Sequence, residues 1–256
     1  MEEVKSIGVI REELQAAASE QLPDFITAYE KDGRTSVQKL VAQAENRVKK
    51  LKAERQRIWE LGSFEREYGA FGYVCGVDEA GRGPLAGPVV AGAVILPGGC
   101  DILYINDSKK LSEKKREELY DVILKQAVAV GVGMASPRRI DEVNILNATY
   151  EAMQEAIQKL SQAPDILLND AVTIPGISIL QVPIIKGDAK SISIGAASII
   201  AKVTRDRIME QYHKEMPEYG FASNKGYGTK DHIQALKTYG ACPIHRASFI
   251  QKFLNS

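Results

Sequence analysis

One stretch constrains the fold of this 256-residue chain more than any other: residues 73–96 read YVCGVDEAGRGPLAGPVVAGAVIL. The run 74–77 favours a β-strand and is followed by two adjacent carboxylates, Asp78 and Glu79. A glycine-rich turn then leads into a second strand-like run, residues 89–96. Because adjacent residues on a strand point to opposite faces, both acids can serve one site only if the strand ends at Asp78 and the backbone turns there.

Gly81 and Gly83 allow this turn, and a backbone without side chains suits a phosphate-bearing ligand beside a divalent metal. The plain alternative is an ordinary hairpin with two solvated acids at its tip. A dinucleotide-binding loop is excluded, because Gly81, Gly83 and Gly87 have the spacing G-x-G-x-x-x-G and Pro84 spoils the helix that such a loop requires.

The composition bounds the class of protein. Hydrophobic residues make up 45% of the chain, and no run approaches the roughly 20 apolar residues of a membrane span, so we expect a soluble protein without membrane contact. The acidic residues 1–6 do not resemble a signal peptide, and three unpaired cysteines favour a cytoplasmic location. The net charge is zero, but residues 186–256 carry eleven basic and six acidic side chains, which favours a polyanionic partner over part of the surface.

Periodicity predicts an α/β protein with a helical extension. Residues 1–70 are expected to form the extension, and residues 71–256 the catalytic domain with a helical carboxyl-terminal part. In the extension, a helix ends before Pro23, and a capping box of Thr35 with Gln38 opens a second helix. Strands are expected at 74–77, 89–96, 127–135, 166–170 and 177–185, and helices at 112–126, 142–160 and 189–214.

The second helix of the extension has a basic side. This stripe is either a solvated surface or an arm that contacts the phosphates of a duplex. Its basic residues are Arg47, Lys49, Lys50, Lys52, Arg55 and Arg57.

Two further acids follow apolar runs later in the chain. Asp170 ends the strand-like run 166–170, and Asp188 lies between an edge strand containing Pro183 and a long helix. Strands separated by a helix usually lie parallel, so acids at their carboxyl ends gather at one edge of the sheet. A helix cap is the alternative role for Asp188. The four carboxylates that can converge are Asp78, Glu79, Asp170 and Asp188.

Two polar loops have the residues to bind a nucleic acid. Lys109 lies in the loop 106–112, where it is either a phosphate ligand or surface charge. Tyr227 lies between Gly226 and Gly228, where its ring can stack on a base or sugar or can cover the core.

The acids indicate a particular chemistry. A cluster of carboxylates without cysteine or a nearby histidine favours Mg²⁺ or Mn²⁺ over zinc. Two such ions about 4 Å apart support phosphodiester hydrolysis. Glycoside hydrolysis is the alternative, but it leaves the lysines and the G-R-G turn without a role.

Five motifs together resemble ribonuclease HII, in the order of that family and over residues 72–254. They are DEAGRGPLAGPV at 78–89, NDSKKLS at 106–112, KGDAKSISIGAASIIAKVTRD at 186–206, KGYGT at 225–229 and HRASF at 245–249. One departure is N-D-A at residues 169–171, where the family usually has V-D-G or V-D-A. It affects the local turn around this acid and keeps Asp170 itself.

The resemblance implies a ribonuclease H-like mixed sheet flanked by helices. It implies an endonuclease that cuts the RNA strand of RNA/DNA hybrids, and that nicks duplex DNA 5′ of a single embedded ribonucleotide. The products would carry 5′-phosphate and 3′-hydroxyl ends, the cofactor would be Mn²⁺ or Mg²⁺, and the protein is expected to be a monomer. The alternatives are a ribonuclease HIII-like enzyme, which would have a G-K-G-like turn, a junction-cleaving nuclease on the same fold, and a binding module that has lost catalysis.

The resemblance also implies roles for individual residues. The catalytic and metal-binding acids fall on Asp78, Glu79, Asp170 and Asp188. The substrate-binding residues fall on Gly81, Arg82, Gly83, Ser108, Lys109 and Tyr227. Within this set, the G-R-G turn would read the ribose 2′-hydroxyl, the group that separates RNA from DNA, and the tyrosine would sense the junction.

Overall fold

The computed structural model describes residues 5–254, which form two compact units, Met1–Glu60 and Leu61–Ser256. The functional division at residue 70 stays a prediction. The first unit consists of α1 (Ile7–Ala16), the 3₁₀ turn η1 (Ser19–Gln21), α2 (Leu22–Tyr29) and most of α3 (Thr35–Leu61). Its core contains Ile10, Leu14, Leu22, Phe25, Val37, Leu40 and Ala44.

Two details of the first unit differ from the sequence prediction. Pro23 lies in the first turn of α2, where its missing N–H costs nothing, and so it begins a helix. The expected capping box of Thr35 and Gln38 is wrong. The Gln38 amide instead donates to the carbonyls of Glu30 and Asp32, at 3.1 and 2.6 Å, and joins the α2–α3 loop to the helix.

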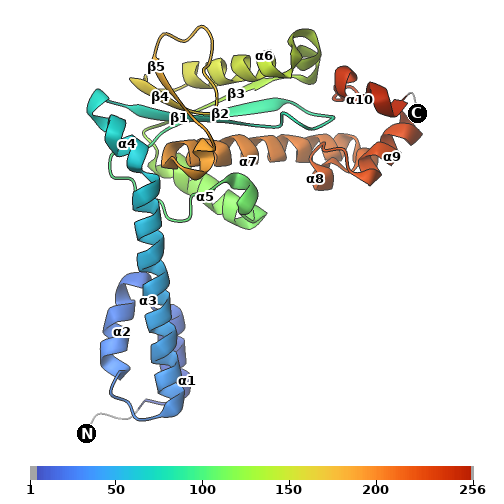
Figure 1. Ribbon diagram of the computed structural model, residues 1–256. Helices are drawn as coiled ribbons and strands as arrows, with labels where there is room; N and C mark the ends of the chain where they lie inside the picture. Colours follow the sequence, from blue (N-terminus) through green and yellow to red (C-terminus); the bar gives the residue numbers. More distant parts are fainter. Residues whose placement is uncertain (1–4, 255–256) are drawn as a thin grey trace. The chain divides into compact units, whose positions relative to one another are not determined.

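The second unit contains a five-stranded mixed sheet in the order β3-β2-β1-β4-β5 (Figure 1). The strands β1, β2 and β3 pair antiparallel, whereas β4 is parallel to β1 and β5 is parallel to β4. As predicted from Pro183, β5 is an edge strand. The strands are β1 (Val74–Ala80), β2 (Val89–Ile95), β3 (Ala129–Ala135), β4 (Ile166–Asp170) and β5 (Leu180–Ile184).

Helices cover both faces of this sheet (Figure 1). The α-helices of the second unit are α4 (Ser63–Tyr68), α5 (Glu113–Gln126), α6 (Pro137–Gln158), α7 (Ile192–Glu215), α8 (Phe221–Asn224), α9 (Lys230–Tyr239) and α10 (Ala247–Leu254). Short 3₁₀ turns are η2 (Gly69–Phe71), η3 (Ser108–Lys110), η4 (Gly187–Ala189) and η5 (Pro217–Tyr219). The predicted fold class, a mixed sheet flanked by helices with a helical amino-terminal region, is confirmed.

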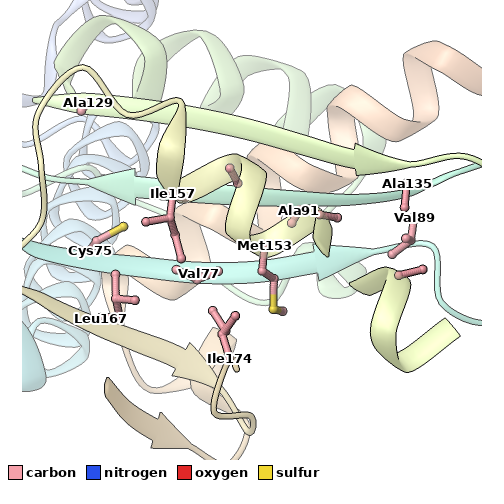
Figure 2. Close-up of a cluster of buried hydrophobic side chains, with 14 of the residues drawn as sticks. Cys75, Val77, Val89, Ala91, Ala129, Ala135, Met153, Ile157, Leu167 and Ile174 are labelled. Carbon is pink, nitrogen blue, oxygen red and sulfur yellow. The ribbon is translucent and has the colours of Figure 1, made fainter. Parts of the chain in front are cut away.

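The main hydrophobic core lies between the sheet and α6. Figure 2 shows Cys75 and Val77 of β1 and Leu167 of β4 facing Met153 and Ile157 of α6. Alternation along β1 and β4 therefore directs the odd-numbered residues of these strands toward α6 and the even-numbered residues toward α7.

Helix α7 lies against the other face at very short range. A Cβ atom on Gly76 would be 2.1 Å from the backbone carbon of Ser193, and one on Gly92 would be 2.5 Å from the Ala197 carbonyl oxygen. Only glycine on the strands permits this approach. Small residues of α7, among them Ser193 and Ala197, therefore pack directly on the sheet.

Helix α6 begins five residues earlier than predicted. Ser136 caps it, with its hydroxyl accepting from the Arg139 N–H at 3.1 Å, and Pro137 occupies the first turn. The helix is interrupted at Asn144, which has φ 68° and whose side chain accepts from the Leu146 N–H at 2.9 Å. The predicted start at residue 142 lies two residues before this interruption, in the first segment. Within residues 5–254, no helix is both long enough and apolar enough to cross a membrane.

Candidate active site

The parallel pairing of β1 with β4 brings Asp78 and Asp170 together. Val77 pairs with Asn169, so the next residue on each strand is an acid, and both acids point to the α7 face. Asp170 is held in place by its Oδ1 atom, which accepts from the Gly187 N–H at 2.7 Å. The sequence prediction that these two acids meet at one edge of the sheet agrees with this register.

Asp78 is buried and destabilised as an anion. It is 5% exposed, and its carboxylate accepts a hydrogen bond from Ser198 of α7. Burial, followed by the charge of Glu79 and then that of Asp170, raises the pKa of Asp78 well above its ordinary value. A carboxylate in this environment favours a nearby positive charge.

Glu79 is positioned differently from the prediction. The expected strand end at Asp78 is wrong, because β1 continues to Ala80 through its pairing with β2, which extends beyond the last residue paired with β4. Alternation alone would direct Glu79 away from Asp78. Even so, burial raises the pKa of Glu79. The charges of Arg82 and Lys109 lower this pKa, and that of Asp170 raises it. The Glu79 carboxylate is therefore within electrostatic range of the other site residues.

Asp188 lies in η4, immediately before α7. It does not cap the helix, because the hydroxyl of Ser191 accepts from the Ile194 N–H at 3.2 Å and occupies that role. The capping alternative is therefore wrong. Burial, and then the charges of Asp107 and Asp170, raise the pKa of Asp188. The loop that carries Asp107 and Lys109 is thus close to the fourth acid.

The four acids fit a hard divalent cation in their chemistry. All are oxygen donors. Burial disfavours ionisation of Asp78, Glu79 and Asp188, and the charges of neighbouring acids add to this effect. The described residues contain no group of three or more His, Cys, Asp or Glu side chains that is already arranged to hold a metal ion. The fit therefore consists of donor type and mutual repulsion.

The turn after Asp170 contains an unusual backbone conformation. Ala171 has φ 56°, in the left-handed region that favours glycine, and its N–H donates to the Ile184 carbonyl at 3.0 Å. A strained alanine therefore lies directly behind the acid, whereas the departure from the family pattern is Asn169, before the acid.

Ser108 and Lys109 have different positions in η3. The Ser108 side chain is 3% exposed, and its hydroxyl lies 3.0 Å from that of Ser198, the residue that contacts Asp78. Lys109 is exposed, and its charge lowers the pKa values of Glu79 and Asp188 against the effect of burial. Lys109 is therefore near the acids at the surface, whereas the Ser108 hydroxyl lies behind them.

The G-R-G turn (residues 81–83) combines one glycine required for packing with one that has free space beside it. Gly81 has φ +96°, and a Cβ atom there would lie 2.1 Å from Arg205 Nε. At Gly83 the nearest atom to such a Cβ would be Tyr227 Cε1, at 4.0 Å. Tyr227 is 45% exposed. The structure therefore places the predicted 2′-hydroxyl reader beside the predicted junction-sensing tyrosine.

Two buried arginines hold this region, and sequence reasoning missed both. Arg205 of α7 donates to the carbonyls of Ala86, Pro88 and Lys225 at 2.9–3.1 Å. Arg246 donates to the carbonyls of Gly81, Arg82 and Gly87 at 2.6–3.0 Å. Burial, and then the charge of Arg205, lower the pKa of Arg246 to about 9. A signal existed in the sequence, since Arg205 and Arg246 both fall within the family motifs.

A mixed sheet with acids at the ends of adjoining parallel strands, next to a glycine-rich turn, defines a ribonuclease H-type nuclease. The solved ribonuclease H2 of Pyrococcus horikoshii superimposes with a TM-score of 0.60 at 31% identity, over 72% of this chain and 97% of that one. The ribonuclease HII of Archaeoglobus fulgidus, solved in a complex with PCNA, superimposes with a TM-score of 0.56 at 27% identity, over 70% and 96% of the two chains.

The chain belongs to the ribonuclease HII family. The family's sequence model matches residues 75–252, and the model of the ribonuclease HII N-terminal domain matches residues 6–69. The ribonuclease HII of Lachnoclostridium phytofermentans is 65% identical over 87% of this chain and 88% of its own. That of Clostridioides difficile is 51% identical over 98% and 99% of the two chains. The protein is therefore a ribonuclease H, an endonuclease that hydrolyses phosphodiester bonds.

Proposed function

We propose that this ribonuclease H cuts the RNA strand of RNA/DNA hybrids and also nicks duplex DNA on the 5′ side of a single embedded ribonucleotide. Cleavage would leave 5′-phosphate and 3′-hydroxyl ends. The observation that carries the proposal is the proximity of Gly83 to the Tyr227 ring: a Cβ atom on Gly83 would lie 4.0 Å from Tyr227 Cε1, and both residues are exposed. One ribonucleotide presents one 2′-hydroxyl, so a single narrow reader is enough to select it.

The reaction would use Mn²⁺ or Mg²⁺, held by Asp78, Glu79, Asp170 and Asp188. When bound, the cation supplies Lewis-acid stabilisation of the charge that develops on the phosphate oxygens. The protein contributes the fixed position of the acids. The Gly187 N–H holds Asp170, Ser198 holds Asp78, and the main-chain N–H of Glu79 donates to Asp78 Oδ1 at 2.8 Å.

Substrate selection would depend on the backbone of the G-R-G turn and on the ring of Tyr227. Glycine exposes its main-chain groups, so that a sugar can approach them closely and its 2′-hydroxyl can form hydrogen bonds. The Tyr227 ring can stack on the adjoining deoxynucleotide. Lys109 would contact a phosphate near the acids. Arg82, whose Nη1 lies 3.4 Å from Glu79 Oε1, would contact a second phosphate. A substrate contact by Ser108 remains part of the proposal.

The decisive experiment uses an end-labelled DNA duplex with one ribonucleotide, next to the same duplex made only of DNA. We expect a nick 5′ of the ribonucleotide with Mn²⁺ or Mg²⁺, no nick after chelation with EDTA, and an intact DNA control. If only a long RNA/DNA hybrid is cut, the enzyme is HIII-like in its specificity. Cleavage of an all-DNA junction would favour a junction nuclease, and cleavage of no substrate would favour a binding module.

A further inference from the structure

A chain of hydrogen bonds between buried side chains ends at the backbone of Tyr227. His232 Nδ1 lies 2.8 Å from the Tyr227 carbonyl oxygen, and His232 Nε2 lies 3.0 Å from His245 Nε2. At the far end, His245 Nδ1 accepts from the Cys242 N–H at 2.9 Å. Both imidazole rings are buried, at 0% and 7% exposure. We call His232 and His245 the histidine pair.

The chemistry of the two ends allows one arrangement of protons. A carbonyl oxygen can only accept, so His232 Nδ1 carries a hydrogen and its Nε2 is an acceptor. A main-chain N–H can only donate, so His245 Nδ1 is an acceptor and its Nε2 donates to His232. Each ring then has one hydrogen and both are neutral. This agrees with the pKa values of both histidines, which burial lowers from their ordinary range.

The residues next to His245 contact the G-R-G turn and residues 85–87, which follow it. Ala86 and His245 form a β-bridge, the Gly87 N–H donates to the Ile244 carbonyl at 2.9 Å, and the Arg246 N–H donates to the Leu85 carbonyl at 2.8 Å. The Arg246 guanidinium donates hydrogen bonds to the carbonyls of Gly81 and Arg82 in the G-R-G turn. One short segment, residues 244–246, therefore contacts the G-R-G turn through Arg246 and the Tyr227 carbonyl through the histidine pair.

The histidine pair adds to the backbone contacts of the Tyr227 loop. Tyr227 lies between Gly226, which has φ +85°, and Gly228; its N–H donates to the Asn224 carbonyl at 2.8 Å, and the Gly226 carbonyl accepts from the Leu85 N–H at 2.8 Å. The Thr229 N–H and His232 Nδ1, both 2.8 Å away, are the partners of the Tyr227 carbonyl in the described part of the chain. Of these two contacts, the second connects the loop to the segment that holds the G-R-G turn.

We propose that His232 and His245 are positioning residues for substrate discrimination: they set the position of Tyr227 relative to the G-R-G turn. The inference rests on the proposed function, because it assumes that Tyr227 contacts the substrate. Neither histidine reaches the acids or the substrate. Their effect is to hold the tyrosine ring at the distance from Gly83 that a ribonucleotide and its neighbour require.

The test compares two substitutions of similar size at one position. In His232→Asn, the amide nitrogen lies near the place of Nδ1 and keeps the bond to the Tyr227 carbonyl. In His232→Gln, the amide lies near the place of Nε2, so that the contact with His245 is kept and the bond to Tyr227 is lost. We expect His232→Gln to lower kcat/KM on the single-ribonucleotide duplex about tenfold, the effect of one neutral hydrogen bond, and His232→Asn to stay within about threefold of wild type. Equal effects of the two variants would overturn the proposal.

A double-substitution cycle separates this proposal from the proposed function. Tyr227→Ala removes the ring and keeps the carbonyl, so the difference between His232→Gln and His232→Asn should disappear in that background. If Tyr227→Ala leaves kcat/KM unchanged, the role of Tyr227 itself is wrong. If Tyr227→Ala is harmful but the difference between the His232 variants persists, the histidines act elsewhere.

A measurement on the unmodified protein does not depend on whether the variants fold. ¹⁵N NMR of the imidazole rings at neutral pH should show the hydrogen on Nδ1 in His232 and on Nε2 in His245. The opposite tautomer in either ring would overturn the hydrogen-bond chain. Residue-specific assignment follows from through-bond correlation of each ring with the backbone of its own residue in ¹³C,¹⁵N-labelled protein.

Discussion

The substitution Gly83→Ala tests the proposed reading of the 2′-hydroxyl directly. A Cβ atom at Gly83 would have Tyr227 Cε1 as its nearest neighbour, at 4.0 Å, which is an ordinary van der Waals distance, and the backbone there is not left-handed. The free energy of unfolding should therefore change by less than about 1 kcal/mol. The new methyl group would occupy the space in which we place the ribose.

The expected loss of activity follows from one displaced hydrogen bond. A 2′-hydroxyl pushed away from its main-chain partner leaves that partner desolvated and unpaired, which costs about 1–3 kcal/mol. This corresponds to a decrease of about 5- to 150-fold in kcat/KM on the single-ribonucleotide duplex. Steady-state cleavage of an end-labelled duplex and thermal unfolding by circular dichroism, on the same preparations, measure both quantities.

Two matched glycine substitutions serve as controls. Gly98→Ala adds a methyl group that has no atom within 4 Å, so it should change neither stability nor activity. Gly81→Ala would place its methyl 2.1 Å from Arg205 Nε at φ +96°, so it should lower the melting temperature. The reasoning is refuted if Gly83→Ala keeps full ribonucleotide selectivity, or if it destabilises the protein as much as Gly81→Ala does.

Four further predictions concern the acids, the strained turn, the histidines and the extension. Asp78→Asn should abolish cleavage and keep hybrid binding in a gel-shift assay. It should not lower the melting temperature, because burial already disfavours the charged carboxylate. Loss of folding and binding together would show that Asp78 has a structural role. Ala171→Gly should stabilise the protein by about 1 kcal/mol in urea unfolding, since φ 56° strains alanine, and an unchanged midpoint would contradict this. The pKa of His245 is lowered from 6.5 to about 4, so the unfolded chain binds more protons between these values, and the contribution of His245 is complete above about pH 6.5. It should be lost as the pH falls to about 4, by about 3 kcal/mol, and His245→Phe should flatten this part of the curve of unfolding free energy against pH. Replacing the three exposed lysines of residues 49–52 by glutamine should weaken hybrid binding and reduce its salt dependence, and an unchanged salt slope would exclude the basic arm.

Local patterns in the sequence were sufficient for the elements and for the identity of the acids. The strand 166–170 was predicted with its observed bounds. A short apolar run that ends on an acid is typical of a buried strand. The helix predicted at 112–126 is α5, which begins at Glu113 and is capped by Ser112, whose hydroxyl accepts from the Lys115 N–H at 3.3 Å. The motifs that carry the resemblance are contiguous in the chain, so family membership was also predictable.

Arrangements that depend on distant segments were decided by the tertiary structure. Strand β1 continues past Asp78 because β2 pairs with it as far as Ala80, and a partner strand is not visible in the local pattern. Arg205 and Arg246 are buried where charged residues usually are not, because the carbonyls that they bind come from segments more than a hundred residues away in the chain, apart from Lys225.

The sequence by itself determined which chemistry this protein can perform: it supplies carboxylates, a glycine turn and a loop tyrosine in the order of the ribonuclease HII family. The tertiary structure alone decided how the glycine turn and the tyrosine come together, through Arg246 and the histidine pair. The physical reason is that side-chain chemistry is a property of each residue. The distance between Gly83 and Tyr227 is set by packing and hydrogen bonds among segments that are separated along the chain.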